Sequence, residues 1–218
     1  MPRPAADMQI KESSDIFRYT QAELDYLRRR DKKLAAAIDR IGMIERGVDR
    51  DIFTALINGV VSQQISSAAA ATVKARLVRL CGGITPERIR SADVEDIQKC
   101  GMSMKKARYI KEIGEIVYSG SLDLTAFYDM PDEEIIKRLS ALPGIGAWTA
   151  EMLLIFSLQR QDVCSFGDLA IRRGMCKLYG LKTLSKEQFT RYRNRYSPYG
   201  SIASLYLWEL SKADAPPI

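Results

Sequence analysis

A chain of 218 residues, 46% of them hydrophobic, is long enough to bury the core of a globular protein. The absence of histidine from the sequence excludes serine and cysteine hydrolase triads, most zinc hydrolases and any imidazole acid or base. The net charge of +6 favours a polyanionic partner. Eight basic residues and one acidic residue lie between Arg172 and Arg195, and this basic sector could contact a polyanion or form a solvated helix surface.

The sequence carries no signal for export or for a membrane anchor. Residues 1–15 lack the apolar segment of a secretory signal, and no apolar run reaches the roughly 20 residues of a membrane span. The four cysteines form no CxxC pair, which argues against a zinc or iron–sulfur site and predicts free thiols in a reducing compartment. We therefore expect a cytoplasmic protein, or a nuclear one in a eukaryote.

The first third of the chain has the pattern of helices. A capping box at Thr20–Glu23 predicts the start of one helix, and the apolar spacing that follows predicts a second helix that ends at Gly42. Apolar residues from Ile52 to Val61 mark one face of a third helix. The uncharged polar segment SQQIS, residues 62–66, then interrupts the pattern before an alanine-rich helix.

The middle of the chain continues as short helices with recognisable starts. Thr85 and Pro86 supply an N-cap and a first helical residue. We expect Ser91 to cap the next helix, with acidic residues in its first turn. Gly101 is expected to open a helix that is basic in its first turns, and Pro131 to start the helix before Leu142.

The segment LPGIG, residues 142–146, is a glycine turn that leads directly into an apolar helix. Such a turn exposes backbone amides at a helix N-terminus, where a phosphate binds well, although ordinary helix–helix turns have similar residues. Asp168 precedes a later helix and could be a plain N-cap. Most such aspartates do nothing else, but a cap is compatible with a chemically active carboxylate that the helix dipole keeps ionised. Asp162, nearby, is interpreted as a connector residue.

The segments LPGIGAWTAEMLL (142–154) and SFGDLAIRRG (165–174) resemble the helix–hairpin–helix DNA glycosylases. The similarity extends to ALINGVVSQQISSAAAATV (55–73), GMSMKKARYI (101–110) and SPYGSIASLYLW (197–208), so it covers most of the chain from about residue 50. Bifunctional members of this superfamily, which also cleave the DNA strand, carry a lysine at the position of Trp148. That lysine and the clustered cysteines of the iron–sulfur branches are both missing here. The resemblance is therefore to the alkylation-repair branch, similar to DNA-3-methyladenine glycosylase II.

This resemblance implies roles for several side chains. Asp168 is the catalytic carboxylate, which stabilises an oxocarbenium-like sugar and orients or activates water. Trp148 and Tyr199 belong to the base pocket, where aromatic faces suit a cationic alkylated base. Met152 stands in this pocket where the well-known bacterial type has a tyrosine, which leaves the range of lesions open.

Other residues are assigned to the DNA backbone and to the gap that a flipped base leaves. Gln64, or Gln63 as second choice, resembles the wedge that fills this gap, although SQQIS could also be a plain polar loop. Lys106, Arg108 and Arg173 are candidates for phosphate contacts, although any single basic side chain could equally be a solvated surface residue. The other candidates are the hairpin amides and two side chains: Gly144, Ile145, Gly146, Ala147, Lys105 and Arg172. No organic cofactor and no metal centre is implied, although the carbonyls of Leu142 and Ile145 could hold a monovalent cation, as they do in relatives.

We therefore predict an all-α fold, a two-lobed helical bundle with a helix–hairpin–helix motif and an active-site cleft between the lobes. Residues 50–160 would form one lobe, and residues 1–49 with 161–218 the second lobe, which carries the catalytic aspartate. The implied function is that of a monofunctional DNA glycosylase, acting as a monomer on double-stranded DNA. It flips out and excises 3-methyladenine-type N-alkylpurines and leaves an abasic site. The alternatives are a glycosylase for an oxidised or deaminated base and a non-catalytic helix–hairpin–helix DNA-binding protein.

Overall fold

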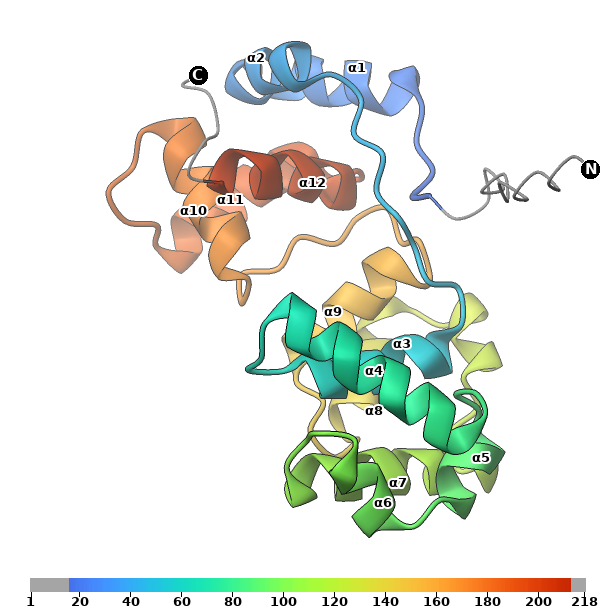
Figure 1. Ribbon diagram of the computed structural model, residues 1–218. Helices are drawn as coiled ribbons and strands as arrows, with labels where there is room; N and C mark the ends of the chain where they lie inside the picture. Colours follow the sequence, from blue (N-terminus) through green and yellow to red (C-terminus); the bar gives the residue numbers. More distant parts are fainter. Residues whose placement is uncertain (1–15, 213–218) are drawn as a thin grey trace, which may run out of the picture.

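The computed structural model describes residues 16–212, which fold almost entirely into helices (Figure 1). Within this range no strand forms, and the one β pairing is an isolated bridge between Ile16 and Gly47. None of the helices in the described part of the chain combines the length and the apolar character that crossing a bilayer requires. The prediction of an all-α fold is confirmed.

The helices gather into two groups, one above the other in Figure 1. The upper group contains α1 (Gln21–Arg30), α2 (Lys32–Ile41), α10 (Leu169–Tyr179), α11 (Lys186–Tyr196) and α12 (Gly200–Ser211). The lower group contains α3 (Ile52–Ser62), α4 (Ser67–Cys81), α5 (Pro86–Ser91), α6 (Val94–Lys99), α7 (Met104–Tyr118), the 3₁₀ segment η1 (Thr125–Asp129), α8 (Asp132–Ser140) and α9 (Ala147–Phe156).

The chain passes between the two groups twice, through residues 42–51 and 157–168. The first crossing is bonded to the end of α9, where the amide of Asp49 donates to the carbonyl of Phe156 over 2.8 Å. The first and last parts of the chain therefore share the upper group, while the central part forms the lower one. The division into two domains at residues 50 and 160 stays a prediction.

Several helices start at the residues that the sequence predicts. The capping box at Thr20–Glu23 is formed, and the Thr85 side chain caps α5. The predicted cap at Ser91 is wrong, because Ser91 is the last residue of α5 and its hydroxyl donates to the carbonyl of Glu87 over 2.8 Å. The ammonium group of Lys111, from α7, bonds the carbonyls at the end of α5 and fixes where this helix ends. Tertiary contact thus decides a boundary that local sequence does not.

The upper group is organised around α12. Every residue of this helix from Gly200 to Leu207 is buried, Ser201 and Ser204 included, which agrees with its largely apolar sequence. Helix α10 lies so close to α12 that Gly174 faces the backbone carbonyl of Leu207. This close approach sets the position of α10, and with it the position of Asp168 at its N-terminus.

We expect Gly174→Ala to destabilise the protein. A methyl group at residue 174 would overlap the carbonyl of Leu207, a backbone atom that cannot rotate away. The expected loss in the free energy of unfolding is about 1–3 kcal/mol, the usual cost of overpacking, measured by chemical denaturation. Gly146→Ala is the matched control, because no atom lies within 4 Å of its added methyl group. A parental unfolding midpoint for Gly174→Ala would contradict the packing described.

Candidate active site

The turn between α8 and α9 forms a helix–hairpin–helix. Gly144 has a φ of 77°, and a side chain at this position would run into the ring of Tyr109 from α7. Gly146 is the N-cap of α9 and supplies no side-chain acceptor for the first amides of the helix. The hairpin therefore presents backbone amides at a helix N-terminus, where the macrodipole favours an anion. Its contact with a phosphate stays a prediction.

Trp148 and Asp168 come from different groups of helices and meet directly. The indole N–H of Trp148, at the start of α9, donates to Oδ2 of Asp168 over 2.9 Å. Asp168 is the N-cap of α10, and its Oδ1 accepts the amides of Ala170 and Ile171 over 2.8 and 2.9 Å. The aspartate is 7% exposed, whereas the tryptophan is 47% exposed. Three donors satisfy a buried carboxylate, and each oxygen keeps capacity for a further contact.

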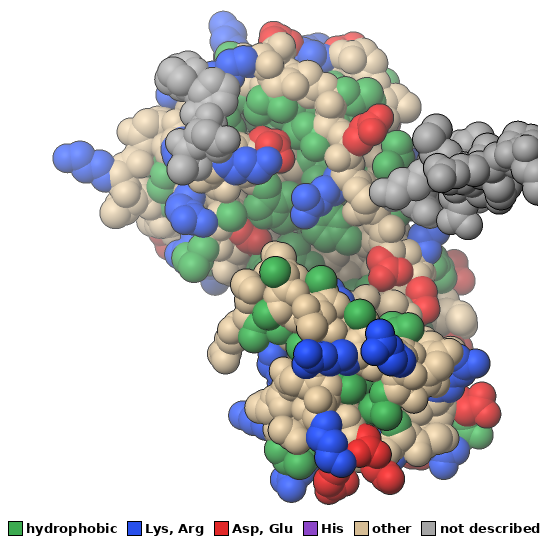
Figure 2. Space-filling view, in the orientation of Figure 1, with side chains coloured by type: hydrophobic (Ala, Val, Ile, Leu, Met, Phe, Trp, Pro, Cys, Tyr) green, Lys and Arg blue, Asp and Glu red, His purple; other side chains and the backbone are tan. Residues whose placement is uncertain are grey.

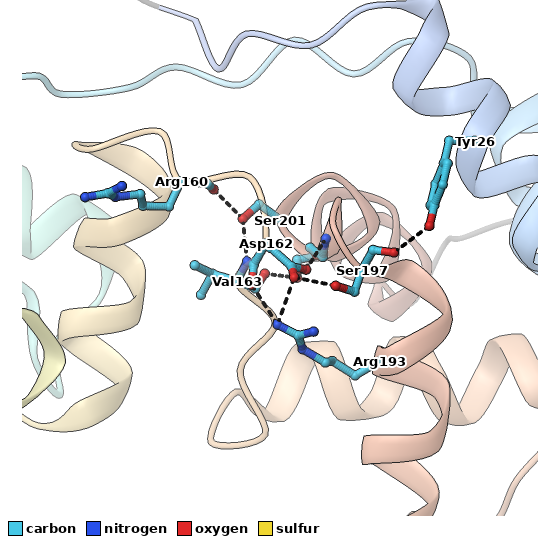
Figure 3. A network of polar contacts seen from close by, with 9 residues as sticks. Tyr26, Arg160, Asp162, Val163, Arg193, Ser197 and Ser201 are labelled. Carbon is cyan, nitrogen blue, oxygen red and sulfur yellow. Dashed lines mark hydrogen bonds and ion pairs between the residues drawn. The ribbon is translucent and has the colours of Figure 1, made fainter. Parts of the chain in front are cut away.

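The segment that carries Asp168 is bonded to α11 and α12 (Figure 3). Asp162 accepts the amide of Gly200 and the hydroxyl of Ser197, over 3.0 and 2.6 Å. Its carboxylate also pairs with Arg193 over 3.3 Å. One residue further on, the amide of Val163 donates to the hydroxyl of Ser201 over 2.9 Å. Asp162 is thus a connector residue, as its position in the sequence indicates, and it anchors the connector to the upper group.

Arg160 attaches the same segment to the lower group. Its guanidinium donates to the carbonyls of Phe127 and Met130 over 2.8 Å each, and pairs with Asp132 over 3.2 Å. Its own carbonyl accepts the hydroxyl of Ser201 in α12. Residues 160–163 therefore hold both groups of helices, and this fixes Trp148 relative to Asp168.

A cavity of about 320 Å³ opens beside Trp148. The molecule as a whole narrows between its two groups of helices (Figure 2). Trp148, Met152 and Phe156 line it from one face of α9. Gln63 and Gln64, from the loop after α3, also line it, as does Asp49 from the first crossing. The structure thus brings four of the predicted site residues together: Trp148, Met152, Gln63 and Gln64.

Tyr199 is not among the residues that line this cavity. Its ring packs edge-on against Tyr26 of α1, with 5.2 Å between ring centroids. Phe156 and Asp49 line the cavity without having been predicted. The spacing of four residues from Trp148 through Met152 to Phe156 was a usable signal for a shared helix face. Asp49 had no such signal, because only the crossing of the chain brings it there.

The predicted phosphate contacts differ in their surroundings. Lys105 is exposed, with its ammonium 5.7 Å from the centre of the Tyr109 ring. The guanidinium of Arg172 lies over the ring of Phe166 at 5.2 Å. Further along the basic sector, Arg193 and Arg195 form ion pairs with Asp162 and Asp31. Part of this sector therefore stabilises the fold, in addition to any role at the surface.

A second carboxyl group, that of Glu151, lies on α9 one turn after Trp148 and close to Asp168. Burial raises the pKa of Glu151 above its usual range. The hydrogen bond from the Ser165 hydroxyl opposes this effect, and the negative charge of Asp168 adds to it. The site thus holds two acids in unequal environments.

The chain belongs to the HhH-GPD superfamily of base excision DNA repair proteins, whose family model matches residues 57–198. DNA-3-methyladenine glycosylase 1 of Schizosaccharomyces pombe is 36% identical over 168 residues, which cover 75% of this chain and 74% of that protein.

Solved structures agree with this assignment. A DNA-3-methyladenine glycosidase from Bacillus halodurans matches with a TM-score of 0.80 at 34% identity, over 88% of this chain and 89% of that one. A 3-methyladenine DNA glycosylase of Schizosaccharomyces pombe in complex with abasic DNA matches with a TM-score of 0.78 at 34% identity, over 90% of this chain and 99% of that one. The resemblance inferred from the sequence motifs is confirmed.

We expect the half-buried carboxyl group of Glu151 to lower stability at neutral pH. Because its pKa is raised in the folded protein, its contribution to stability is full below the usual glutamate value of 4.5 and is lost as the pH rises. Glu151→Gln is neutral at every pH and keeps an acceptor for Ser165. Its melting temperature should match the parent near pH 4 and exceed it at pH 7. Glu133→Gln, on an exposed position of α8, controls for the loss of one acidic charge. Coinciding curves for Glu151→Gln and the parent would show that burial of this carboxyl group costs nothing.

Proposed function

We propose that this chain is a monofunctional DNA glycosylase that excises 3-methyladenine-type N-alkylpurines from double-stranded DNA and leaves an abasic site. The observation that carries the proposal is the contact between Trp148 and the buried Asp168 carboxylate beside an aromatic-walled cavity. The names of its relatives support the choice of lesion, and the relative solved with abasic DNA supports the choice of product.

DNA is held through its backbone. The amides of the hairpin, Gly144 to Ala147, grip one phosphate near the lesion. The exposed ammonium of Lys105 contributes a second contact, and Arg172 a third. Such contacts position the duplex without reading its sequence, which suits a protein that must find a damaged base anywhere.

The damaged base leaves the stack and enters the cavity. Unstacking costs a few kcal/mol, and a side chain pushed into the gap offsets part of this cost. Gln64 has this role, because it is exposed at the edge of the cavity, whereas Gln63 is half buried. The indole of Trp148 provides an aromatic face for the cationic ring of an N-alkylated purine.

Bond cleavage needs charge stabilisation more than acid catalysis. The alkylated base is a good leaving group and takes both electrons of the glycosidic bond, so a chain without histidine can support the reaction. The sugar left behind develops positive charge, which the Asp168 carboxylate stabilises through its unused lone pairs. Water then adds to the sugar carbon and releases its proton to Asp168 or to solvent. With Trp148 where bifunctional relatives have a lysine, no Schiff base forms and the strand stays intact.

The protein acts as a monomer, and in the compartment that holds the genome. The hairpin carbonyls of Leu142 and Ile145 offer the oxygen ligands that a monovalent cation takes. The carbonyl of Leu142 accepts the amide of Ile145 over 3.2 Å and retains a second lone pair, so the residues present fit such an ion. A bound cation would place positive charge beside the gripped phosphate.

Asp168→Asn tests the catalytic role. The variant keeps an oxygen that can cap α10 but removes the negative charge and turns an amide N–H₂ toward the indole N–H of Trp148. We expect base release from a duplex with one 3-methyladenine-type lesion to fall by about 100-fold or more, while binding to abasic DNA persists. Duplexes with oxidised and deaminated bases serve as specificity controls.

Two results would overturn the proposal in different ways. Parental release by Asp168→Asn would remove this residue from catalysis. If the parent bound duplex DNA but released no base from any lesion, the chain would be a DNA-binding protein rather than a glycosylase.

A further inference from the structure

Three segments meet behind the predicted wedge: the loop after α3, the first turn of α7 and the hairpin. Lys106, in the first turn of α7, points into this junction. Its ammonium donates to the carbonyl of Val61 over 3.1 Å and to the carbonyl of Gln63. Val61 lies in the last turn of α3 and Gln63 is its C-cap, so the helix offers neither carbonyl an amide partner. Lys106 thus closes the C-terminus of α3, and its position in the sequence had indicated a phosphate contact instead.

Lys106 differs from the neighbouring Lys105 in its surroundings. Lys105 is exposed, whereas Lys106 is half buried and surrounded by backbone acceptors. Burial lowers the pKa of the Lys106 ammonium, as expected for a cation removed from water. The ammonium group of Lys106 is thus bonded to two backbone carbonyls of the protein itself.

Gln63 connects the same loop to the hairpin. Its side-chain Nε2 donates to the carbonyl of Gly144 over 2.8 Å. Gly144 in turn packs against Tyr109, which lies one turn after Lys106 on α7. The three contacts close a ring: Lys106 joins α7 to the loop, Gln63 joins the loop to the hairpin, and Gly144 joins the hairpin to α7.

Gln64 follows directly and needs this support. Its φ of 60° is in the left-handed region, which is unfavourable for a residue with a side chain and persists only where the surroundings impose it. Gln63, just before it, is bonded both through its backbone and through its side chain. Gln64 itself is exposed at the rim of the cavity. The ring of contacts therefore fixes the conformation in which Gln64 projects.

We propose that Lys106 is a positioning residue for base flipping. It holds the loop that carries Gln64 against the phosphate-binding hairpin, so that the loop and the hairpin move together. The inference rests on the proposed function. It assigns Lys106 no contact with DNA. Once the hairpin has bound a phosphate, a rigid loop places Gln64 at a fixed depth in the base stack.

Lys106→Met is the direct test, because methionine has a similar length and no donor. We expect the single-turnover rate of base release at saturating protein to fall by about ten-fold, the effect of losing hydrogen bonds to a charged donor. Lys137→Met removes the same charge from an exposed position of α8 and should release base at the parental rate. The salt dependence of DNA binding should stay parental for Lys106→Met, whereas Lys105→Met should lose about one phosphate contact from its slope.

A double variant separates positioning from general destabilisation. If Lys106 acts through Gln64, adding Lys106→Met to Gln64→Ala should slow release little further. Equal losses in the parental and Gln64→Ala backgrounds would contradict the proposal, as would a lowered salt slope for Lys106→Met. Should Lys106→Met fail to fold, as judged by thermal melting, Gln63→Met breaks the loop–hairpin bond and is expected to couple to Gln64→Ala in the same way.

Wedge insertion can be followed without catalysis. In a duplex with a tetrahydrofuran abasic analogue, 2-aminopurine beside the gap reports stacking by its fluorescence, and the Lys106→Met signal should fall well below the parental signal. Parental fluorescence and parental release rates for Lys106→Met would overturn the positioning role and leave the glycosylase function standing. If the parent released no base but showed a fluorescence change that Lys106→Met lowers, the glycosylase function would be overturned and the positioning role would stand.

Discussion

The hydrogen bond between the Trp148 indole and the Asp168 carboxylate is the contact on which the site depends. Its two ends belong to different groups of helices, so its 2.9 Å length requires that the groups keep a fixed relation. The connector supplies this relation, since Arg160 holds the lower group and Asp162 the upper one. A buried carboxylate without such donors would carry a large desolvation cost. The contact that joins the two groups of helices therefore also supplies a hydrogen-bond donor to the buried carboxylate.

In the proposed mechanism, one carboxylate, that of Asp168, serves both the fold and the chemistry. Its Oδ1 caps α10, and this bonding keeps the group oriented while the helix dipole favours its negative charge. Its Oδ2 accepts the indole N–H of Trp148, whose side chain also lines the cavity. A site of this kind stabilises a developing cation without moving a proton first, which agrees with a chain that has no histidine and no lysine at the hairpin.

Local signals in the sequence predicted much of the fold. Caps such as Thr20 and Thr85 mark helix starts through contacts within four residues, and these are the contacts that sequence pattern records. The hairpin and Asp168 were assigned by resemblance, and the family match confirms the resemblance, while the roles of individual residues stay predictions.

The contacts that the sequence did not predict share a physical cause, which is a partner distant in the chain. Lys111 ends α5 and displaces the expected cap at Ser91. The ring contact of Tyr199 with Tyr26 and the bond from Lys106 to the carbonyl of Val61 also join segments far apart in the sequence. No spacing rule within one segment contains these contacts.

The fate of the DNA strand tests the central claim most directly. A duplex with one 3-methyladenine-type lesion is incubated with the protein, and the labelled strand is analysed before and after alkali. With Trp148 and Asp168 acting as described, free base appears, the strand stays whole, and it breaks only after alkali treatment. Strand cleavage without alkali, or a protein–DNA adduct trapped by borohydride, would contradict base removal by a carboxylate alone.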